Sequence, residues 1–442
     1  MKNWIRSKLP LTQQDKWSPQ KDPAPRTGLL YTIKTILFQS KLNVLLIFVP
    51  LAFAAKFANL IPIATFTLSA LAIIPLTGLL TYATEIVALS LGVGLGALLN
   101  ITFGNLVELI ILIFMLQEGH LRLVLASLLG SIFVNLLFIL GIAVIAGGLR
   151  NQEQLYSQRL TQMLVYFMNL GILSLLIPTS LHACIKKSKQ ADSVTLDFSR
   201  GIAITLLLVY GLYLHFMLRS RYSMYDELDS RSVSSDGEAQ HETAARPKMA
   251  GTRSLTPSIE MQQLGNSHGR SLSESRSSFV AAARIPVPPE ELDEEAAITR
   301  NASLVLLVVS ACVVSFCAEF LVDSIEHVVA NARLTEAFLG LIILPLLGNT
   351  AELATAVTVA VKNKMDLAIN VTIGSAIQIT LFMAPTMVAL SWFMGKDLSM
   401  HFNIFQIITL LATVAMVNGM MLSGRTHYLL GALLCCCYII IG

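Results

Sequence analysis

The sequence predicts an all-α polytopic membrane protein of about 11 transmembrane helices, with a first helix followed by two inverted five-helix repeats. Three observations lead to this fold class. Hydrophobic residues make up 54% of the 442-residue chain and charged residues only 13%, far from the composition of a soluble domain. Apolar runs long enough to cross a bilayer of ~30 Å recur along the chain. A short motif containing a glutamate occurs twice.

The apolar runs form two blocks separated by a long polar segment, with about six spans in the first block and five in the second. Lys and Arg crowd the first 41 residues, which the positive-inside rule assigns to the cytosol. The expected spans lie at residues 42–57, 61–83, 94–117, 122–148, 160–181, 200–219, 302–325, 336–361, 367–394, 402–422 and 427–441.

Five segments follow from this pattern. We expect residues 1–41 to be a cytosolic N-terminal tail with an amphipathic segment, 42–57 the first transmembrane helix, 58–219 the first repeat and 300–442 the second. Residues 220–299 carry few large apolar side chains and are expected to be a cytosolic disordered linker. The linker ends in PPEELDEEAA, where prolines can start a short acidic helix. This helix is either a solvated cap or a cation-attracting regulatory element.

The repeated motif reads GNLVEL at residues 104–109 and GNTAEL at residues 348–353. The offset of 244 residues also aligns a Gly-Ser pair at 130–131 with one at 374–375, without a gap. With five spans in each repeat, the second repeat enters the membrane from the opposite side. Inverted repeats place a transport site near the bilayer midplane, where broken helices from both halves meet.

Gly104 and Gly348 begin the two motifs inside apolar helices. Glycine tolerates unwound backbone, which frees carbonyl groups to face a cavity, so we expect a helix break at each. Close helix packing is the alternative role of a glycine in a membrane helix, and the repeat favours the break.

Glu108 and Glu352 lie well inside apolar spans, where an ionised side chain costs ~2.5 to 3.5 kcal/mol. Two carboxylates balance the charge of Ca²⁺, a hard cation that prefers oxygen ligands. Without the cation, burial and mutual repulsion favour the protonated carboxyls, so protons are the natural substitute. Neither span has a basic residue near mid-depth, which disfavours a structural ion pair. The sequence therefore predicts a metal site at Glu108 and Glu352.

Neutral polar side chains accompany the two glutamates. Asn105 and Asn349 precede them by three residues, so each pair shares one helix face. An interhelical hydrogen bond is the alternative role for each neutral residue taken alone. The expected cation- and proton-binding set is Glu108, Glu352, Asn105, Asn349, Ser131, Asn135, Ser375 and Gln378.

Further acidic residues suggest a route to this site. Glu319, Asp323 and Glu326 recur at helical spacing on one face of the seventh span, and Glu85 lies near the end of the second. Glu85, Glu319 and Asp323 are therefore candidates for an ion pathway. A position at the membrane interface, where acidic residues are ordinary, is the alternative for Asp323 and Glu326.

GNLVEL, GNTAELATAV, AEFLVDSIEHVV and KMDLAINVTIGSAIQITLF resemble the vacuolar calcium/proton exchangers of the calcium/cation antiporter superfamily. The resemblance covers residues 28–219 and 300–441. It implies eleven spans, with Glu108 and Glu352 binding Ca²⁺ and then protons. It also implies uptake of cytosolic Ca²⁺, sometimes Mn²⁺, into an acidic organelle, driven by the proton gradient of a vacuolar pump.

Two positions depart from the family pattern. Leu353 follows the second glutamate, where the family usually has histidine. Val134 stands where the family generally has serine, and it is the repeat mate of Gln378. These departures bear on affinity, cation choice and proton coupling.

We expect a secondary antiporter that exchanges Ca²⁺, Mn²⁺ or another divalent cation for H⁺ by alternating access. It is expected in an organellar membrane, with the vacuole implied by the family. An exchanger using Na⁺ or K⁺ and a transport-impaired cation sensor are the alternatives with the same fold. A channel could also use paired acids, but the inverted repeat argues against one.

Other classes are disfavoured. No Ser/His, HExxH or paired-Asp arrangement lies at depth, so we expect no enzyme and no cofactor. The formal charge of +3 and the absence of a basic stripe with interleaved aromatics disfavour nucleic acid. The expected partners are membrane lipid and the transported Ca²⁺ and protons, and a homo-oligomer stays open.

Overall fold

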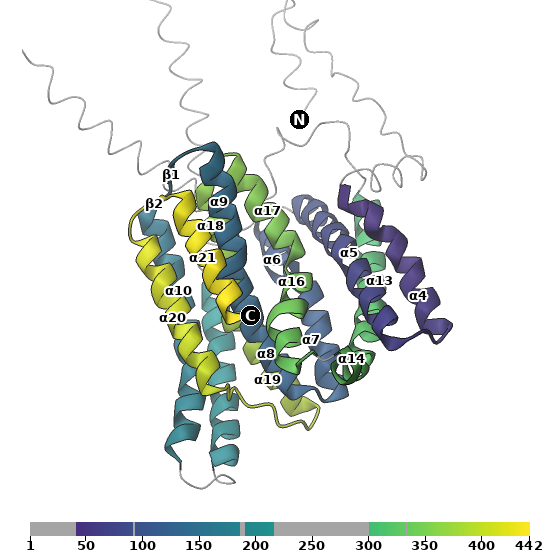
Figure 1. The fold of residues 1–442 in the computed structure, drawn as a ribbon. Coiled ribbons are helices and arrows are strands. Elements are labelled where there is room, and N and C mark those ends of the chain that lie inside the picture. Colours follow the sequence, from purple (N-terminus) through teal and green to yellow (C-terminus); the bar gives the residue numbers. More distant parts are fainter. Residues whose placement is uncertain (1–40, 92, 186–190, 216–299, 333) are drawn as a thin grey trace, which may run out of the picture.

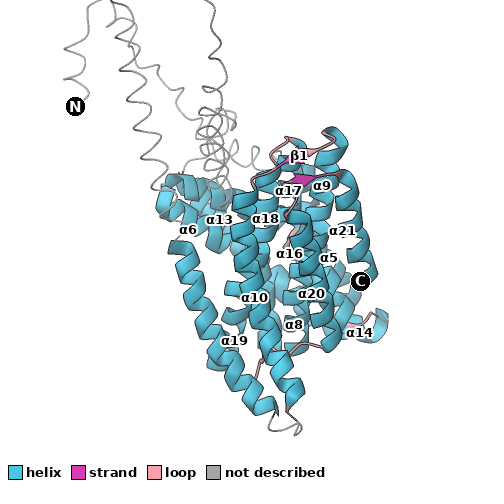
Figure 2. Ribbon diagram, turned by 90° about the vertical axis from the view of Figure 1, so that its left-hand side faces the viewer, coloured by secondary structure: helices cyan, strands magenta, loops and turns pink. Residues whose placement is uncertain are grey.

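The computed structural model describes residues 41–442 apart from 92, 186–190, 216–299 and 333. Residues 1–40 of the expected tail therefore lie outside the described residues. The expected linker at 220–299, with its acidic helix, also lies outside them. The described chain is nearly all helical and forms a bundle, with a small antiparallel sheet at one end (Figure 1, Figure 2).

The first half of the described chain begins with a short 3₁₀ segment and ends with a helix at the edge of the bundle. Its elements are η1 (Lys41–Ile47), α4 (Phe48–Phe57), α5 (Pro62–Ser90), α6 (Val93–Phe103), α7 (Leu106–Glu118), α8 (Leu121–Phe133), η2 (Val134–Ile139), α9 (Leu140–Arg150), β1 (Gln154–Leu155), α10 (Gln158–Cys184) and the helix Ala191–His215.

The second half has a similar order of elements. They are α13 (Arg300–Asp323), α14 (Ile325–Ala332), α15 (Glu336–Phe338), η3 (Leu339–Ile343), α16 (Leu344–Gly348), α17 (Thr350–Val361), α18 (Met365–Gln378), η4 (Ile379–Met383), α19 (Ala384–Phe393), α20 (Ile404–Met421), β2 (Arg425–Thr426) and α21 (Tyr428–Ile441).

Local sequence signals set several helix ends. Pro62 begins α5, where its fixed φ suits the first turn and its missing N–H costs nothing. Gly119 ends α7 with φ +85°, the left-handed conformation that glycine adopts without strain. Asn403 and Gln406 form a capping box at the start of α20, which satisfies backbone N–H groups that have no partner within the helix.

Two repeat-related spans form the centre of the bundle. The span Leu121–Arg150, made of α8, η2 and α9, and the span Met365–Phe393, made of α18, η4 and α19, each have 83% of their most apolar window buried. The helix Ala191–His215 has only 28% buried and lies at the edge. Both central spans contain a π-helical turn near their midpoint, a feature often found at functional sites.

The membrane class is confirmed. Among the described residues, seven helices are long and apolar enough to cross a bilayer, and an eighth span is the bent pair Glu336–Gly348 and Thr350–Val361. The apolar helices Asn43–Phe57 and Tyr428–Ile441 are shorter, and α6 and α7 lie end to end as two short helices. The count of about 11 spans therefore stays a prediction.

One predicted boundary is displaced. The sixth span is expected at 200–219, whereas the helix starts at Ala191. Its first turns bury Ala191, Thr195 and Ser199, one helix face of small or hydroxyl side chains at four-residue spacing. The same turns carry Asp192 and Asp197 on their exposed side, which lower the hydropathy, so hydropathy alone places the start too late.

Candidate cation-binding site

Both GN motifs interrupt a helix. α6 ends at Phe103 and α7 begins at Leu106, with Gly104 and Asn105 between them. In the second repeat, α16 ends at Gly348 and α17 begins after Asn349, with a bend of 58° between the two parts of the span.

The two asparagines at the breaks have nearly the same backbone conformation. Asn105 has φ −107° and ψ 28°, and Asn349 has φ −100° and ψ 20°. Glu108 and Glu352 consequently lie in the first turn of α7 and α17. The positive end of each helix dipole stabilises a carboxylate at this position.

The two glutamates lie near each other in the interior. Each is only 2% exposed, and Glu352, Ser131 and Asn349 lie close enough to the Glu108 carboxyl to act on it electrostatically. Ser131 and Asn349 are the neighbouring polar groups, and neither carboxylate oxygen of Glu108 makes a hydrogen bond of standard geometry to a described residue. These oxygens have free lone pairs, as the ligands of a cation require.

Asn105 of the first repeat is held by α18 of the second. Its Nδ2 donates to Gln378 Oε1 at 3.1 Å and lies 3.2 Å from Ser375 Oγ. The Ser375 hydroxyl is also 3.3 Å from Asn105 Oδ1, so it can donate or accept. The break in one repeat is therefore joined to the central span of the other.

Asn349 of the second repeat is held by the first repeat in the same way. Its Oδ1 accepts from Asn135 Nδ2 at 2.8 Å, and its Nδ2 donates to Ser131 Oγ at 3.4 Å and to the Pro345 carbonyl at 2.9 Å. Both asparagines thus bridge the two repeats, but Asn105 donates to Gln378 whereas Asn349 accepts from Asn135.

The structure buries all eight expected cation- and proton-binding residues. Hydrogen bonds join Asn105 with Ser375 and Gln378, and Asn349 with Ser131 and Asn135. Their exposed fractions are Asn105 7%, Glu108 2%, Ser131 0%, Asn135 0%, Asn349 1%, Glu352 2%, Ser375 1% and Gln378 7%.

The donor set suits a hard cation. Within the described part of the chain, no group of three or more His, Cys, Asp and Glu side chains is placed to hold a metal. Besides the two carboxylates, the ligands would therefore be amide and hydroxyl oxygens, which Ca²⁺ accepts at 2.3–2.6 Å. A soft or nitrogen-preferring metal would find no suitable donors here.

Gly348 lies against Glu108 across the repeat interface. A Cβ atom at Gly348 would be 3.3 Å from Glu108 Cβ and 3.6 Å from its Cα. The motif glycine thus marks the helix break and also leaves room for the glutamate of the other repeat.

The two departures from the family pattern are both packed into apolar surroundings. Val134 is fully buried at the start of η2, and Leu353 packs against the hydrophobic core. Gln378 bonds to Asn105 in one half, and Asn135 bonds to Asn349 in the other. Asn135 lies one residue after Val134, which is the repeat mate of Gln378. The polar shell is therefore similar in the two halves despite the missing oxygen at Val134.

The three candidate pathway acids, Glu85, Glu319 and Asp323, are not among the eight site residues, and their surroundings differ. Asp323 forms an ion pair with Lys56 at 2.6 Å, which ties α4 to α13. Glu319 is exposed on α13, and Glu85 is partly buried in α5 beside Tyr82. A pathway role for these residues stays a prediction.

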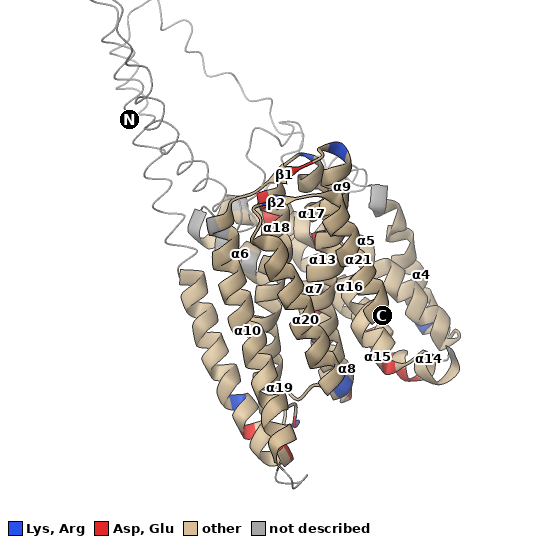
Figure 3. Ribbon diagram, turned by 60° about the vertical axis from the view of Figure 1, so that its left-hand side comes forward, with Lys and Arg blue, Asp and Glu red and all other residues tan. Residues whose placement is uncertain are grey.

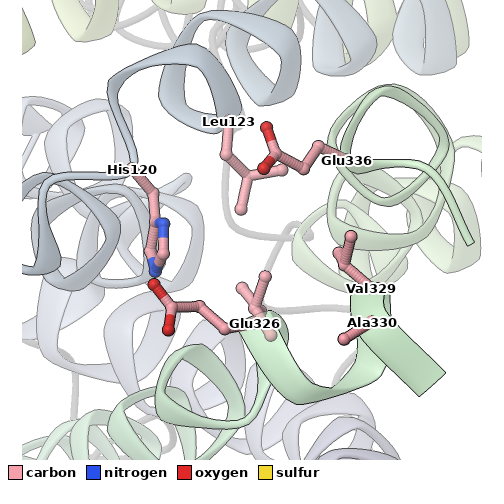
Figure 4. A pocket seen from close by; sticks show the side chains of 7 residues that line it. His120, Leu123, Glu326, Val329, Ala330 and Glu336 are labelled. Carbon is pink, nitrogen blue, oxygen red and sulfur yellow. The ribbon is translucent and has the colours of Figure 1, made fainter.

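A separate cavity of about 290 Å³ lies where the α7–α8 turn meets α14 and α15 (Figure 4). The ring of His120 faces the carboxylate of Glu326, and Glu336 lies on the opposite wall (Figure 4). None of the eight expected site residues is among those that line it.

A membrane bundle in which two broken helices from opposite halves meet at buried carboxylates has the architecture of an inverted-repeat transporter. The family model described as sodium/calcium exchanger protein matches residues 61–219 and 302–441. The chain belongs to this family.

Two curated relatives are similar along most of their length. The vacuolar calcium ion transporter of Schizosaccharomyces pombe is 33% identical over 92% of this chain and 85% of its own. The Ca(2+)/H(+) antiporter of Synechocystis sp. is 35% identical over 90% of this chain and 95% of its own. The predicted membership in the calcium/cation antiporter superfamily is confirmed.

Solved structures share the fold. The structure of native YfkE has a TM-score of 0.65 and 25% identity, and the match covers 90% of this chain and 98% of that one. The H⁺/Ca²⁺ exchanger CAX has a TM-score of 0.58 at 14% identity, over 92% of this chain and 88% of that one. The predicted all-α polytopic fold is confirmed.

Proposed function

We propose that this protein is a secondary antiporter that exchanges Ca²⁺ for H⁺ across the vacuolar membrane, with the cation bound between Glu108 and Glu352. The observation that carries the proposal is the pairing of two buried glutamates, each in the first turn of a half-helix after a break. The names of the curated relatives agree, as vacuolar calcium ion transporter and Ca(2+)/H(+) antiporter.

The exchange follows from the charge of the site. Two carboxylates in a buried environment need either a divalent cation or protons to offset their charge. Ca²⁺ therefore leaves when protons enter from the acidic side, and protons leave when Ca²⁺ enters from the cytosol. Because the same two oxygen pairs hold both ions, the two cannot occupy the site together, and this exclusion couples their flows.

Asn105 and Asn349 orient the site. Each lies at a helix break and is hydrogen-bonded to the central span of the opposite repeat, which fixes the first turn that carries the glutamate. The amide and hydroxyl oxygens around the carboxylates complete the coordination of Ca²⁺, and alternating access follows from movement of the repeats about this shared centre.

The charge distribution supports an orientation in the membrane. Most of the charged residues lie near the two ends of the bundle (Figure 3). Lys and Arg crowd residues 1–41, which the positive-inside rule assigns to the cytosol. The end with β1 and β2, which carries Arg150, Lys362, Lys364 and Arg425, is expected on the same side, with Lys56, Arg122, Arg200 and Lys396 toward the other end. The N-terminal tail and the linker belong on this cytosolic side, and the turns around α14 and α19 face the lumen.

Uptake by purified protein in acid-loaded proteoliposomes tests the proposal. Radioactive Ca²⁺ should enter the wild-type vesicles, a protonophore should abolish uptake, and an imposed Na⁺ or K⁺ gradient should not replace the pH gradient. Glu108→Gln and Glu352→Gln should each remove uptake. Uptake that persists in either variant, or that a Na⁺ or K⁺ gradient drives equally well, would overturn the proposal.

A further inference from the structure

Two connecting loops each contact the opposite repeat. Residues 394–403 join α19 to α20 in the second repeat, and residues 151–157 join α9 to α10 in the first. The loops lie at opposite ends of the bundle, and each contacts the far end of the glutamate-bearing half-helix of the other repeat.

Lys396 of the second repeat binds the end of α7 in the first. Its Nζ donates to the carbonyls of Leu116 and Gln117, at 2.5 Å each. These carbonyls belong to the last turn of α7, and the Leu116 carbonyl also accepts from the Gly119 N–H at 3.1 Å. A positive charge there also interacts favourably with the helix dipole.

Gln154 of the first repeat binds the end of α17 in the second. Its Nε2 donates to the Ala360 carbonyl at 2.9 Å and to Asn363 Oδ1 at 3.0 Å. Gly147 in α9 leaves the space for this contact, because a Cβ atom there would collide with Gln154 Oε1 and lie 3.0 Å from the Ala360 carbonyl.

The carbonyls that accept these two contacts are at equivalent positions of the two repeats. Leu116 and Ala360 are 244 residues apart, the offset that relates the two motifs. The donors are not repeat mates, since Gln152 stands at the position equivalent to Lys396. The same carbonyl is therefore bound in both halves, by a cation at one end of the bundle and by a neutral amide at the other.

The loop 394–403 is itself fastened to the first repeat. The Met400 N–H donates to Ser199 Oγ and the Phe402 N–H donates to Thr179 Oγ1, both at 3.0 Å. Asp397 forms an ion pair with Arg200 at 3.4 Å. These contacts place Lys396 beside α7 without relying on the lysine.

The loop 151–157 is fastened to the second repeat in turn. The Ser157 N–H donates to Asp366 Oδ1 at 2.7 Å, and the Tyr156 hydroxyl donates to the Met420 carbonyl at 3.2 Å. Pairing of β1 with β2 adds Gln154 and Leu155 to the turn before α21.

We propose that Lys396 and Gln154 are positioning residues of the cation site, each holding the glutamate helix of the opposite repeat by its far end. The inference rests on the proposed function of Glu108 and Glu352. α7 has 13 residues and spans about 20 Å as a stiff rod. Its other end is a break, so the anchor at Leu116 and Gln117 adds to the core packing of Ile111, Leu112 and Met115 in setting its direction. A small tilt there moves the Glu108 carboxylate relative to Glu352.

Paired variants test this arrangement in the full-length protein. Lys396→Met keeps the apolar stem and removes the donors, and Gln154→Met does the same in the other half. Hydrogen exchange measured by mass spectrometry should accelerate in α7 but not α17 for Lys396→Met, and in α17 but not α7 for Gln154→Met. Each variant is thus the control for the other.

Transport separates a positioning role from general destabilisation. In proteoliposomes, Lys396→Met should raise the KM for Ca²⁺ about threefold to tenfold, with the maximal rate within twofold of wild type. Lys396→Arg should have a KM close to that of wild type, because the guanidinium can reach the same carbonyls. Arg122→Met removes a positive charge from an exposed residue at the start of α8 and should leave the KM unchanged.

The outcomes distinguish this inference from the proposed function. If exchange in α7 is unchanged in Lys396→Met, or if both helices accelerate equally in both variants, the inference is wrong even where Ca²⁺ uptake is intact. If wild-type protein takes up no Ca²⁺, the proposed function fails, while the exchange measurement still decides whether the two loops anchor the opposite helices. A KM effect that Arg122→Met reproduces would also overturn the positioning role of Lys396.

Discussion

Replacement of Gly348 by alanine perturbs the site with a single methyl group. The new Cβ would lie 3.3 Å from Glu108 Cβ and 3.6 Å from Glu108 Cα and Cγ. Carbon atoms pack best at about 3.5–4.0 Å. Because Cβ and Cα of Glu108 are fixed to the backbone, rotation of the side chain cannot relieve the contact, and the first turn of α7 must shift by a few tenths of an ångström.

That shift is comparable to the tolerance of the site, since Ca²⁺–oxygen distances vary only between about 2.3 and 2.6 Å. We expect a loss of about 1–2 kcal/mol in cation binding, which corresponds to a roughly 5- to 30-fold higher KM for Ca²⁺. The fold should survive, because alanine favours the helix over glycine by up to about 1 kcal/mol, which offsets part of the crowding.

Gly374→Ala is the matched control. Gly374 lies in the central span α18, and a Cβ there would have nothing within 4 Å. Both variants should be assayed as Ca²⁺ uptake against Ca²⁺ concentration at a fixed pH gradient, with thermal unfolding in detergent measured in parallel. If Gly348→Ala has the KM of wild type, or if Gly374→Ala changes it equally, the placement of Gly348 against Glu108 does not matter for binding.

Two further predictions concern the shell of the site and the loop between α19 and α20. Asn135→Leu removes the 2.8 Å bond to Asn349 Oδ1 inside the protein and should cost about 1–3 kcal/mol of stability, seen as a lower Tm; an unchanged Tm would contradict the bridge. Burial, then the stacked ring of His182, lowers the pKa of His401, while Asp192 acts in the opposite direction. Its neutral form is thus favoured in the folded protein, so stability should fall as pH drops from about 6.5 through the lower folded pKa. His401→Gln should flatten the dependence of Tm on pH in this window, and an equally steep dependence would contradict the assignment.

Much of the site follows from the sequence because its signals are local. The spacing of Asn105 and Glu108, repeated at Asn349 and Glu352, fixes which side chains share a helix face. Glycine at each break and an apolar flank on both sides indicate where the half-helices start. The repeat offset then brings Ser131 and Ser375 into the same region without any knowledge of the packing.

Other features depend on three-dimensional contacts that no periodicity reports. Asn135 bonds to Asn349 as Gln378 bonds to Asn105. The repeat offset pairs Gln378 with Val134 and not with Asn135, so it does not predict this contact. Lys396 and Gln154 bind backbone carbonyls, and an acceptor on the main chain leaves no trace in side-chain identity. Asp323 can be recognised as an acid at helical spacing, but its partner Lys56 comes from a helix 267 residues away.

The central claim is that Ca²⁺ and protons compete for the same two carboxylates, and the number of protons released as Ca²⁺ binds tests it most directly. Titration calorimetry of the purified protein in buffers of different ionisation enthalpy gives this number. Wild-type protein should release protons on binding Ca²⁺, and Glu108→Gln and Glu352→Gln should each lose binding. Ca²⁺ binding without proton release, or binding that survives in either variant, would contradict the shared site.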